Sequence, residues 1–231
     1  MSTTSMNSPA GAPSDPVADP AADPAADPAA DPAADKAALR KAAAATRAAL
    51  AKQMPDAANQ LAAHADMIAN KIADIGAGAI VAAYLPIRSE LSPLPLVAAL
   101  NARGVVTAMP VTPEPENPLT FHQWAPGDPL VDGPYKTQQP SADAPLVTPA
   151  VILAPMLAFD AACWRLGYGG GFYDRTLGGL RAAGRTVTAI GIAYDGQKVD
   201  QIPTGPYDMA LDGVLTPSGL IQPPVATSGE L

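Results

Sequence analysis

The pattern of apolar and polar residues changes repeatedly along the chain after about residue 36. Long alanine- and leucine-rich stretches favour helices, whereas short apolar runs bounded by Gly, Pro or polar residues are typical of buried strands. The pattern predicts helices at 36–53, 56–74, 94–103 and 172–183, and strands at 79–85, 105–109, 119–124, 151–155, 186–194 and 213–216. Because helices and strands alternate, we expect an α/β fold with a mostly parallel sheet.

Two further features refine this prediction. Asp35 and Asp56 stand at the expected starts of the first two helices, where a side-chain oxygen can cap free backbone N–H groups. The alternation in LTFHQW (119–124) predicts a strand that leaves His122 exposed. The stretch 125–149 is rich in Pro, Gly, Asp and Ser, and it predicts a long loop.

The first part of the chain has a different character. Residues 16–35 repeat Ala-Ala-Asp-Pro, and a proline at every fourth position blocks a continuous helix. Six of the 22 acidic side chains and none of the 14 basic ones lie in residues 1–35, which leaves 36–231 with a net charge of −2. With no large apolar side chains to bury, 1–34 are predicted to form a disordered tail, either inert or a functional acidic arm, followed by one domain at 35–231.

Composition excludes several classes of protein. Cys163 is the only cysteine and His64 and His122 are the only histidines, so a disulfide framework, a cysteine zinc cluster and a His-rich metal centre are not expected. The domain lacks the basic charge that drives binding to nucleic acid. With no signal peptide and no apolar run long enough to span a membrane, we expect a cytoplasmic monomer without nucleic-acid or membrane partners.

Most of the residues suited to binding or catalysis lie in the segment 155–175, PMLAFDAACWRLGYGGGFYDR, between a predicted strand and a predicted helix. Its glycines allow the backbone to approach a ligand closely, and successive N–H groups at a helix start favour an anion such as phosphate. Arg165 and Arg175 add positive charge, and Asp174 is suited to Mg²⁺. Nearby aromatic residues suit a flat heterocycle. The alternative is a tight turn that binds nothing, since neither a Walker loop nor a complete dinucleotide motif is present.

Four segments form an ordered pattern: Lys36-Ala-Ala-Leu-Arg40, Tyr84-Leu-Pro86 with Glu90, the run Phe159-Asp160 … Arg165-Leu-Gly-Tyr-Gly-Gly-Gly-Phe-Tyr-Asp174, and Ile202-Pro203 with Asp208 and Asp212. In content and order these segments resemble the 5-formyltetrahydrofolate cyclo-ligase family. The resemblance covers about 36–216. It implies a three-layer α/β/α sandwich and an enzyme that converts 5-formyltetrahydrofolate and ATP, with Mg²⁺, into 5,10-methenyltetrahydrofolate, ADP and phosphate. In that reaction ATP phosphorylates the formyl oxygen before N10 attacks the formyl carbon.

The resemblance also implies roles for individual residues. For ATP it implies Lys36, Arg40, Arg165, Leu166, Gly167, Tyr168, Gly169, Gly170, Gly171, Phe172 and Tyr173. For the reduced folate it implies Leu85, Glu90, Tyr135, Tyr168 and Phe172, and for Mg²⁺ it implies Asp174 and Asp208. Arg165 would in addition be catalytic, because it would neutralise charge on the transferring phosphoryl group.

The sequence departs from the family pattern at three positions. Gly170 stands where many relatives carry Lys, Cys163 where Gly is usual, and Tyr207 where a more polar residue is expected. Two other functions stay open at this stage. One is a module that binds folate or nucleotide without catalysis, which would not need Asp174, Asp208 and Arg165. The other is a sugar-phosphate isomerase, which would need a carboxylate base that the sequence does not offer.

Overall fold

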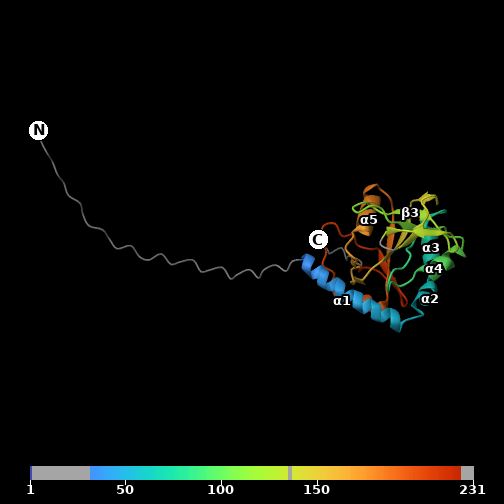
Figure 1. Cartoon of the computed structure of the whole chain (residues 1–231), viewed down its shortest axis with the longest axis horizontal. Coiled ribbons are helices and arrows are strands. Elements are labelled where there is room, and N and C mark those ends of the chain that lie inside the picture. Colours follow the sequence, from blue (N-terminus) through green and yellow to red (C-terminus); the bar gives the residue numbers. More distant parts are fainter. Residues whose placement is uncertain (2–31, 135–136, 225–231) are drawn as a thin grey trace, which may run out of the picture. The chain divides into compact units, whose positions relative to one another are not determined.

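The computed structural model describes residue 1, residues 32–134 and residues 137–224 of the chain. Residues 2–31 of the predicted disordered tail and the predicted folate contact Tyr135 lie outside the described residues. The helices are α1 (Pro32–Gln53), α2 (Ala57–Ala62), α3 (Ala65–Ile75), α4 (Leu94–Asn101), α5 (Phe172–Ala182) and the short 3₁₀ helix η2 (Asp195–Gln197). Figure 1 shows α1 along one side of the domain, with α5 and the group α2–α4 apart from it.

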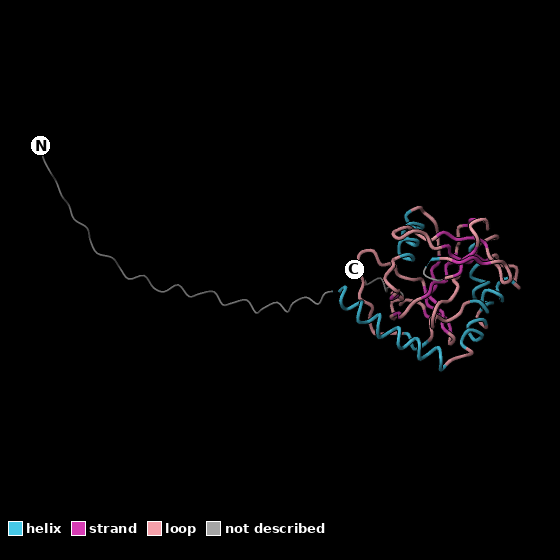
Figure 2. The backbone as a smooth tube through the Cα atoms, viewed as in Figure 1, coloured by secondary structure: helices cyan, strands magenta, loops and turns pink. Residues whose placement is uncertain are grey.

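The central sheet has eight strands in the order β12-β11-β10-β7-β1-β2-β3-β6. These strands are β1 (Val81–Ala82), β2 (Thr107–Val111), β3 (Thr120–Gln123), β6 (Leu146–Val147), β7 (Val151–Pro155), β10 (Thr188–Ile192), β11 (Gly213–Thr216) and β12 (Gly219–Ile221). The five central strands β11, β10, β7, β1 and β2 are parallel, and β12, β3 and β6 join antiparallel at the edges. Two small antiparallel pairs, β4 (Leu130–Asp132) with β5 (Gln138–Pro140) and β8 (Ala158–Phe159) with β9 (Arg165–Leu166), lie outside this sheet (Figure 2).

Successive residues of the central strands point to opposite faces of the sheet, and each face is covered by helices. Val151 and Leu153 pack in one apolar cluster with residues of α2, α3 and α4. Ile152 and Ala154 pack in the other cluster with Leu177 of α5. The strands read as continuous apolar runs because both faces are buried. The predicted three-layer α/β/α sandwich with a mostly parallel sheet is therefore confirmed.

Helix α1 contacts the first of these clusters through Leu50 and Ala51 near its end. Its residues Leu39, Ala43 and Ala44 join a third apolar cluster with Leu157 and Ala158, which follow β7. The helix begins at Pro32 rather than at the predicted residue 36. Proline is tolerated in the first turn of a helix because the N–H group that it lacks has no partner within the helix.

Several details of the predicted elements are wrong. Asp35 lies inside α1 rather than at its start, and Asp56 makes no side-chain capping hydrogen bond at the start of α2. The helix expected at 56–74 is broken, because the chain turns at Ala63 and His64 between α2 and α3, and His64 Nε2 lies 3.1 Å from the carbonyl oxygen of Pro217. The predicted loop 125–149 contains β4, β5 and β6. Because β6 pairs with β3, His122 is buried rather than exposed, and its Nδ1 lies 2.7 Å from the carbonyl oxygen of Ala144.

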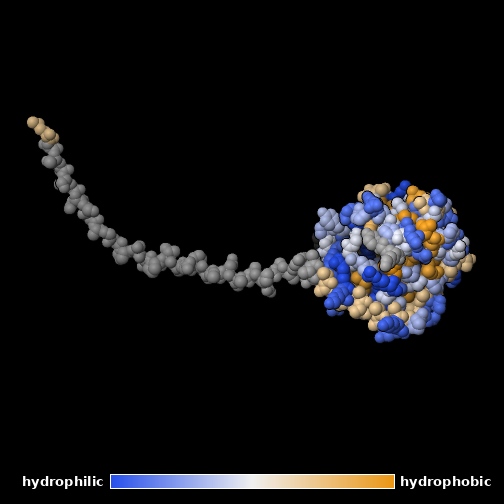
Figure 3. Space-filling view, viewed as in Figure 1, coloured by the Kyte–Doolittle hydropathy of each residue, from blue (hydrophilic) through white to orange (hydrophobic). Residues whose placement is uncertain are grey.

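Hydrophilic residues cover much of the visible face of the domain, with smaller apolar areas between them (Figure 3). Within residues 32–134 and 137–224, no helix has the length and apolar character needed to cross a bilayer.

Candidate active site

A cavity of about 670 Å³ opens at the carboxyl ends of the parallel strands β1, β2 and β7. The chain places β2 on one side of β1 and β7 on the other, so the strand order reverses at β1. Ligands of open α/β sheets bind at such a switch point, beyond the carboxyl ends of the strands. The cavity is lined by the start of α1, the loop after β1, the end of β7, the stretch from β9 into α5, and Asp208. Further lining residues are Pro110, Thr112, Leu119, Thr137 and Gln138.

The glycine-rich turn forms one wall of the cavity and leads directly into α5. Gly169 has φ = +101° and Gly171, the N-cap of α5, has φ = +66°, backbone conformations that are costly for other residues. Arg40 of α1 donates from Nε to the carbonyl oxygen of Gly167 (3.1 Å), and Arg175 donates from Nη2 to that of Gly170 (2.7 Å). The wall therefore combines the N-terminus of a helix with basic side chains, which suits an anion.

Gly170, one of the expected departures from the family pattern, is exposed to solvent and lies beside the ring of Phe172. A Cβ atom at this position would lie 3.0 Å from the ring of Phe172, which packs against the turn. Arg175 lies over the same ring, with its Cζ 5.2 Å from the ring centroid. In this chain the space beside Gly170 is thus taken by an aromatic side chain.

Two ion pairs lie beside the glycine turn, one between β9 and α5 and the other between α1 and the segment 205–209. Arg165 donates from Nη2 to Asp174 Oδ1 (2.8 Å) and from Nη1 to the carbonyl oxygen of Met209 (2.5 Å), and its side chain is 5% exposed. Lys36 Nζ lies 2.6 Å from Asp208 Oδ2. Burial raises the pKa of Asp208, but the hydrogen bonds from Lys36 and from the backbone of Gly205 outweigh it and lower the pKa below its ordinary value. Asp208 therefore stays ionised at neutral pH.

The two aspartates retain coordination capacity despite these contacts. The N–H of Met209 and Arg165 both donate to Oδ1 of Asp174, and the N–H of Gly205 and Lys36 both donate to Oδ2 of Asp208. No cluster of three or more His, Cys, Asp or Glu side chains able to hold an ion occurs among the described residues. Two carboxylates with one oxygen each to spare fit an Mg²⁺ ion that takes its other ligands from phosphate and water.

Glu90 lines another part of the cavity, in the loop after β1. Only 9% of the residue is exposed, its Oε2 accepts a hydrogen bond from the N–H of Ile87 (2.9 Å), and its Oε1 lies 3.7 Å from Nη1 of Arg47. Burial raises the pKa of Glu90 above its ordinary value, and the Ile87 hydrogen bond and the charges of Arg47 and Arg88 offset only part of this shift. A buried carboxylate that lines a cavity can accept hydrogen bonds from paired N–H donors of a heterocycle.

The structure brings together almost every site residue predicted from the sequence. The predicted residues that line the cavity are Lys36, Arg40, Leu85, Glu90, Arg165, Leu166, Gly167, Tyr168, Gly169, Gly170, Gly171, Phe172, Tyr173, Asp174 and Asp208. Tyr135 lies outside the described residues, although its neighbours Thr137 and Gln138 line the cavity.

Other lining residues were not singled out in the sequence. They are Tyr84, Ile87, Arg88, Pro110, Thr112, Leu119, Thr137, Gln138 and Pro155. The backbone of Arg88 is unusual in the structure, because its φ of +55° is uncommon for a residue other than glycine. Tyr84 was quoted only as part of a motif, and its position directly after a buried strand could have identified it.

Comparisons with known proteins agree with this geometry. A family model described as the 5-formyltetrahydrofolate cyclo-ligase family matches residues 32–217. The 5-formyltetrahydrofolate cyclo-ligase of Escherichia coli K12 is 36% identical over 143 residues, which are 60% of this chain and 78% of that protein. The enzyme of the same name from Mycolicibacterium smegmatis is 36% identical over 151 residues, 61% of this chain and 74% of that protein.

Solved structures share the fold at lower identity. A 5,10-methenyltetrahydrofolate synthetase from Mycoplasma pneumoniae aligns with a TM-score of 0.60 at 23% identity, covering 79% of this chain and 99% of that one. The 5,10-methenyltetrahydrofolate synthetase of Aquifex aeolicus aligns with a TM-score of 0.63 at 23% identity, covering 85% of this chain and 96% of that one.

Proposed function

The chain belongs to the 5-formyltetrahydrofolate cyclo-ligase family, and we propose that it uses ATP and Mg²⁺ to cyclise 5-formyltetrahydrofolate to 5,10-methenyltetrahydrofolate, releasing ADP and phosphate. The observation that carries the proposal is the set of residues that line the cavity described above. One wall offers a helix N-terminus and cations to phosphate, and the other offers a buried carboxylate and aromatic rings to a heterocycle. Both substrates can therefore meet in one space.

The proposed reaction requires ATP and the folate to be bound next to each other. The formyl oxygen of an amide-like group is a poor leaving group, so N10 cannot displace it directly. Transfer of the terminal phosphoryl group of ATP to that oxygen releases ADP and makes the oxygen part of a phosphate ester. N10 then attacks the formyl carbon and loses its proton, which closes the ring, and the carbon–oxygen bond breaks as phosphate leaves.

Phosphoryl transfer depends mainly on positioning and on stabilisation of charge. The backbone N–H groups of Gly169–Gly171 and the start of α5 would hold phosphate oxygens, with Lys36 and Arg40 beside them. Arg165 is held by Asp174 and by the carbonyl oxygen of Met209, so its orientation is fixed before the substrate arrives. A preorganised guanidinium next to the phosphate wall would stabilise the charge that develops on the transferring group.

Asp174 and Asp208 would hold Mg²⁺ through the carboxylate oxygens that their contacts with Arg165 and Lys36 leave to spare. The ion would supply charge neutralisation for the nucleotide phosphates. Both aspartates belong to the network that fixes Arg165 or Lys36, so loss of either carboxylate would also release a cation of the phosphate wall.

At the other wall, Glu90 would accept hydrogen bonds from the pterin ring while Leu85 packs beside it. Tyr168 and Phe172 belong to the glycine turn and line the same cavity, where they would flank the folate. The residues that bind folate and those that bind phosphate thus share one turn, which would place the formyl group close to the end of the nucleotide.

The direct test is to mix the protein with 5-formyltetrahydrofolate, ATP and Mg²⁺ and to follow the near-ultraviolet absorbance of the methenyl product. We expect a rise that requires ATP and the divalent ion. Tight binding of 5-formyltetrahydrofolate without any ATP-dependent rise would instead indicate a non-catalytic binding module.

A further inference from the structure

Arg47 is a fully buried arginine that does not itself line the cavity, and only 1% of the residue is exposed. On α1 it lies seven residues after Arg40 and eleven residues after Lys36, which are about two and three helical turns. All three basic side chains therefore point toward the same side of the helix. The side chains of Lys36 and Arg40 line the cavity, whereas the side chain of Arg47 is buried and does not line it.

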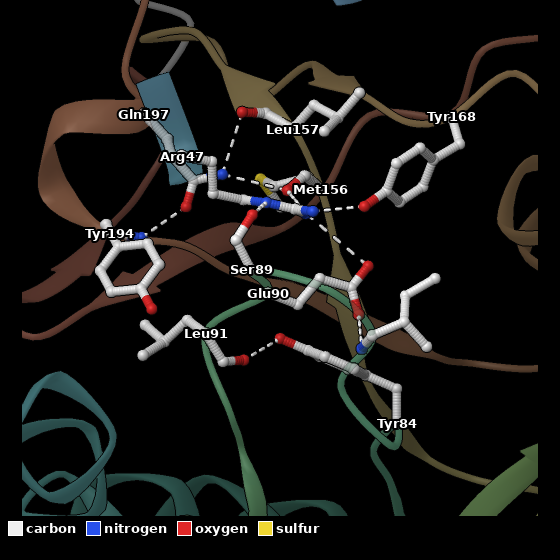
Figure 4. Close-up of polar contacts among 11 residues, drawn as sticks. Arg47, Tyr84, Ser89, Glu90, Leu91, Met156, Leu157, Tyr168, Tyr194 and Gln197 are labelled. Atoms are coloured by element: carbon white, nitrogen blue, oxygen red, sulfur yellow. Dashed lines mark hydrogen bonds and ion pairs between the residues drawn. The ribbon is translucent and has the colours of Figure 1, made fainter. Parts of the chain in front are cut away.

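The guanidinium of Arg47 connects three segments that are far apart in the sequence (Figure 4). Nε donates to Oγ of Ser89 (3.3 Å), Nη1 donates to the carbonyl oxygen of Met156 (3.0 Å), and Nη2 donates to the hydroxyl of Tyr168. Nη1 also lies 3.7 Å from Oε1 of Glu90. One side chain thus contacts the loop after β1, the loop after β7 and the glycine turn.

The partners of Arg47 are themselves fixed. Gln197 donates from Nε2 to the carbonyl oxygens of Met156 and Leu157 (both 3.0 Å), so the backbone that accepts from Arg47 is held from its other side. The guanidinium also lies under the ring of Tyr168, with Cζ 5.4 Å from the ring centroid. Such an arrangement leaves Glu90 and Tyr168 little freedom to move.

Taking an arginine out of water is costly unless its hydrogen bonds are satisfied, and an apolar residue of similar volume often serves stability as well. The stability of the fold alone therefore does not explain why an arginine, rather than an apolar residue, occupies this buried position. We propose that Arg47 is a positioning residue that holds the Glu90 carboxylate and the Tyr168 hydroxyl in the arrangement that receives the pterin ring. This inference rests on the proposed function, and it assigns Arg47 to the folate side of the cavity rather than to the nucleotide side.

The charges around Glu90 are consistent with this role. Burial raises the pKa of Glu90, and the cations Arg47 from α1 and Arg88 from its own loop lower it. The other titratable groups that face it are the phenols of Tyr84, which follows β1, and Tyr173 of α5. Arg47 is thus the buried charge that favours the ionised form of Glu90, which can accept hydrogen bonds but cannot donate them.

The test compares Arg47→Met, Arg47→Lys and a control, Arg103→Met, which removes an exposed ion pair with Asp66. Steady-state kinetics would give the KM for 5-formyltetrahydrofolate and for ATP separately, and calorimetry would give the affinity for ATP with Mg²⁺. For Arg47→Met we expect the folate KM to rise about tenfold or more, equivalent to the loss of a charge-assisted hydrogen bond, while nucleotide affinity stays within about twofold. Arg47→Lys should fall between Arg47→Met and the unmodified protein, and the control should match the unmodified protein.

A pH series provides a readout that a packing defect would not move. Without Arg47 the pKa of Glu90 rises further, so the folate KM of Arg47→Met should begin to increase at a higher pH as the solution is acidified. An unshifted profile, or equal losses of folate and nucleotide affinity, would overturn the inference.

If Arg47→Met does not fold, Tyr168→Phe removes the hydroxyl that Arg47 contacts and should raise the folate KM alone, and an unchanged folate KM would again overturn the inference. Absence of ATP-dependent product from the unmodified protein would instead refute the proposed function.

Discussion

Replacing Arg165 with Met tests the assignment of the phosphoryl-transfer site. Methionine keeps most of the buried volume but removes the guanidinium that bonds to Asp174 and to the carbonyl oxygen of Met209. The side chain is only 5% exposed, so water does not readily take the place of the lost cation. The substitution therefore removes one preorganised charge from the phosphate wall while leaving the glycine turn in place.

The expected effect follows from the burial of this cation. Removing one preorganised donor that faces developing charge costs about 3 kcal/mol of transition-state stabilisation. At about 1.4 kcal/mol for each tenfold change, kcat should fall by about two orders of magnitude. Burial lowers the pKa of Arg165 and the charge of Asp174 raises it, and an arginine with that partner stays protonated throughout the assay range.

The assay is the ATP-dependent formation of the methenyl product under saturating substrates, with Arg181→Met as the matched control. Arg181 lies on α5, the helix that also carries Asp174, where it pairs with Asp212 and does not line the cavity. The control should retain the kcat of the unmodified protein. An Arg165→Met enzyme with unchanged kcat, and with changes only in Tm, would refute the assignment of Arg165 to the transferring group.

Four further predictions concern other parts of the molecule. Asp174→Asn should raise the Mg²⁺ concentration for half-maximal rate about tenfold, and an identical metal titration would exclude ligation. Glu90→Gln should raise the folate KM about tenfold with little change in the ATP KM, measured by steady-state kinetics. Gly171→Ala, at φ = +66° with a Cβ 2.6 Å from Arg175 Nη1, should cost about 1 kcal/mol and lower the Tm by about 2–4 °C in thermal unfolding. Deleting residues 2–31 should leave kcat unchanged in the same assay, and a large loss would show that the acidic segment takes part in turnover.

The layers of the fold and the cavity wall around the glycine turn are predictable from local patterns. Continuous apolar runs such as 151–155 report a strand buried on both faces. The glycines between β9 and α5 mark a backbone that must adopt positive φ, and two of them do so at Gly169 and Gly171. Both signals depend only on nearby residues, and both are confirmed.

The parts that sequence reasoning missed depend on contacts between distant segments. His122 is buried because β6 and Ala144, more than twenty residues later, cover its strand, and no pattern within 119–124 reports that. The break between α2 and α3 brings His64 to Pro217 in the same way. Arg47 sits in an alanine-rich helix, and only the fold reveals that it is buried against Glu90 and Tyr168.

The central claim is that the cavity places the terminal phosphoryl group of ATP against the formyl oxygen of the folate. It is tested most directly with 5-formyltetrahydrofolate whose formyl oxygen is oxygen-18, followed by mass spectrometry of the phosphate released during turnover. The account predicts that the heavy oxygen appears in the inorganic phosphate. Phosphate without the label, formed while methenyl product accumulates, would contradict it.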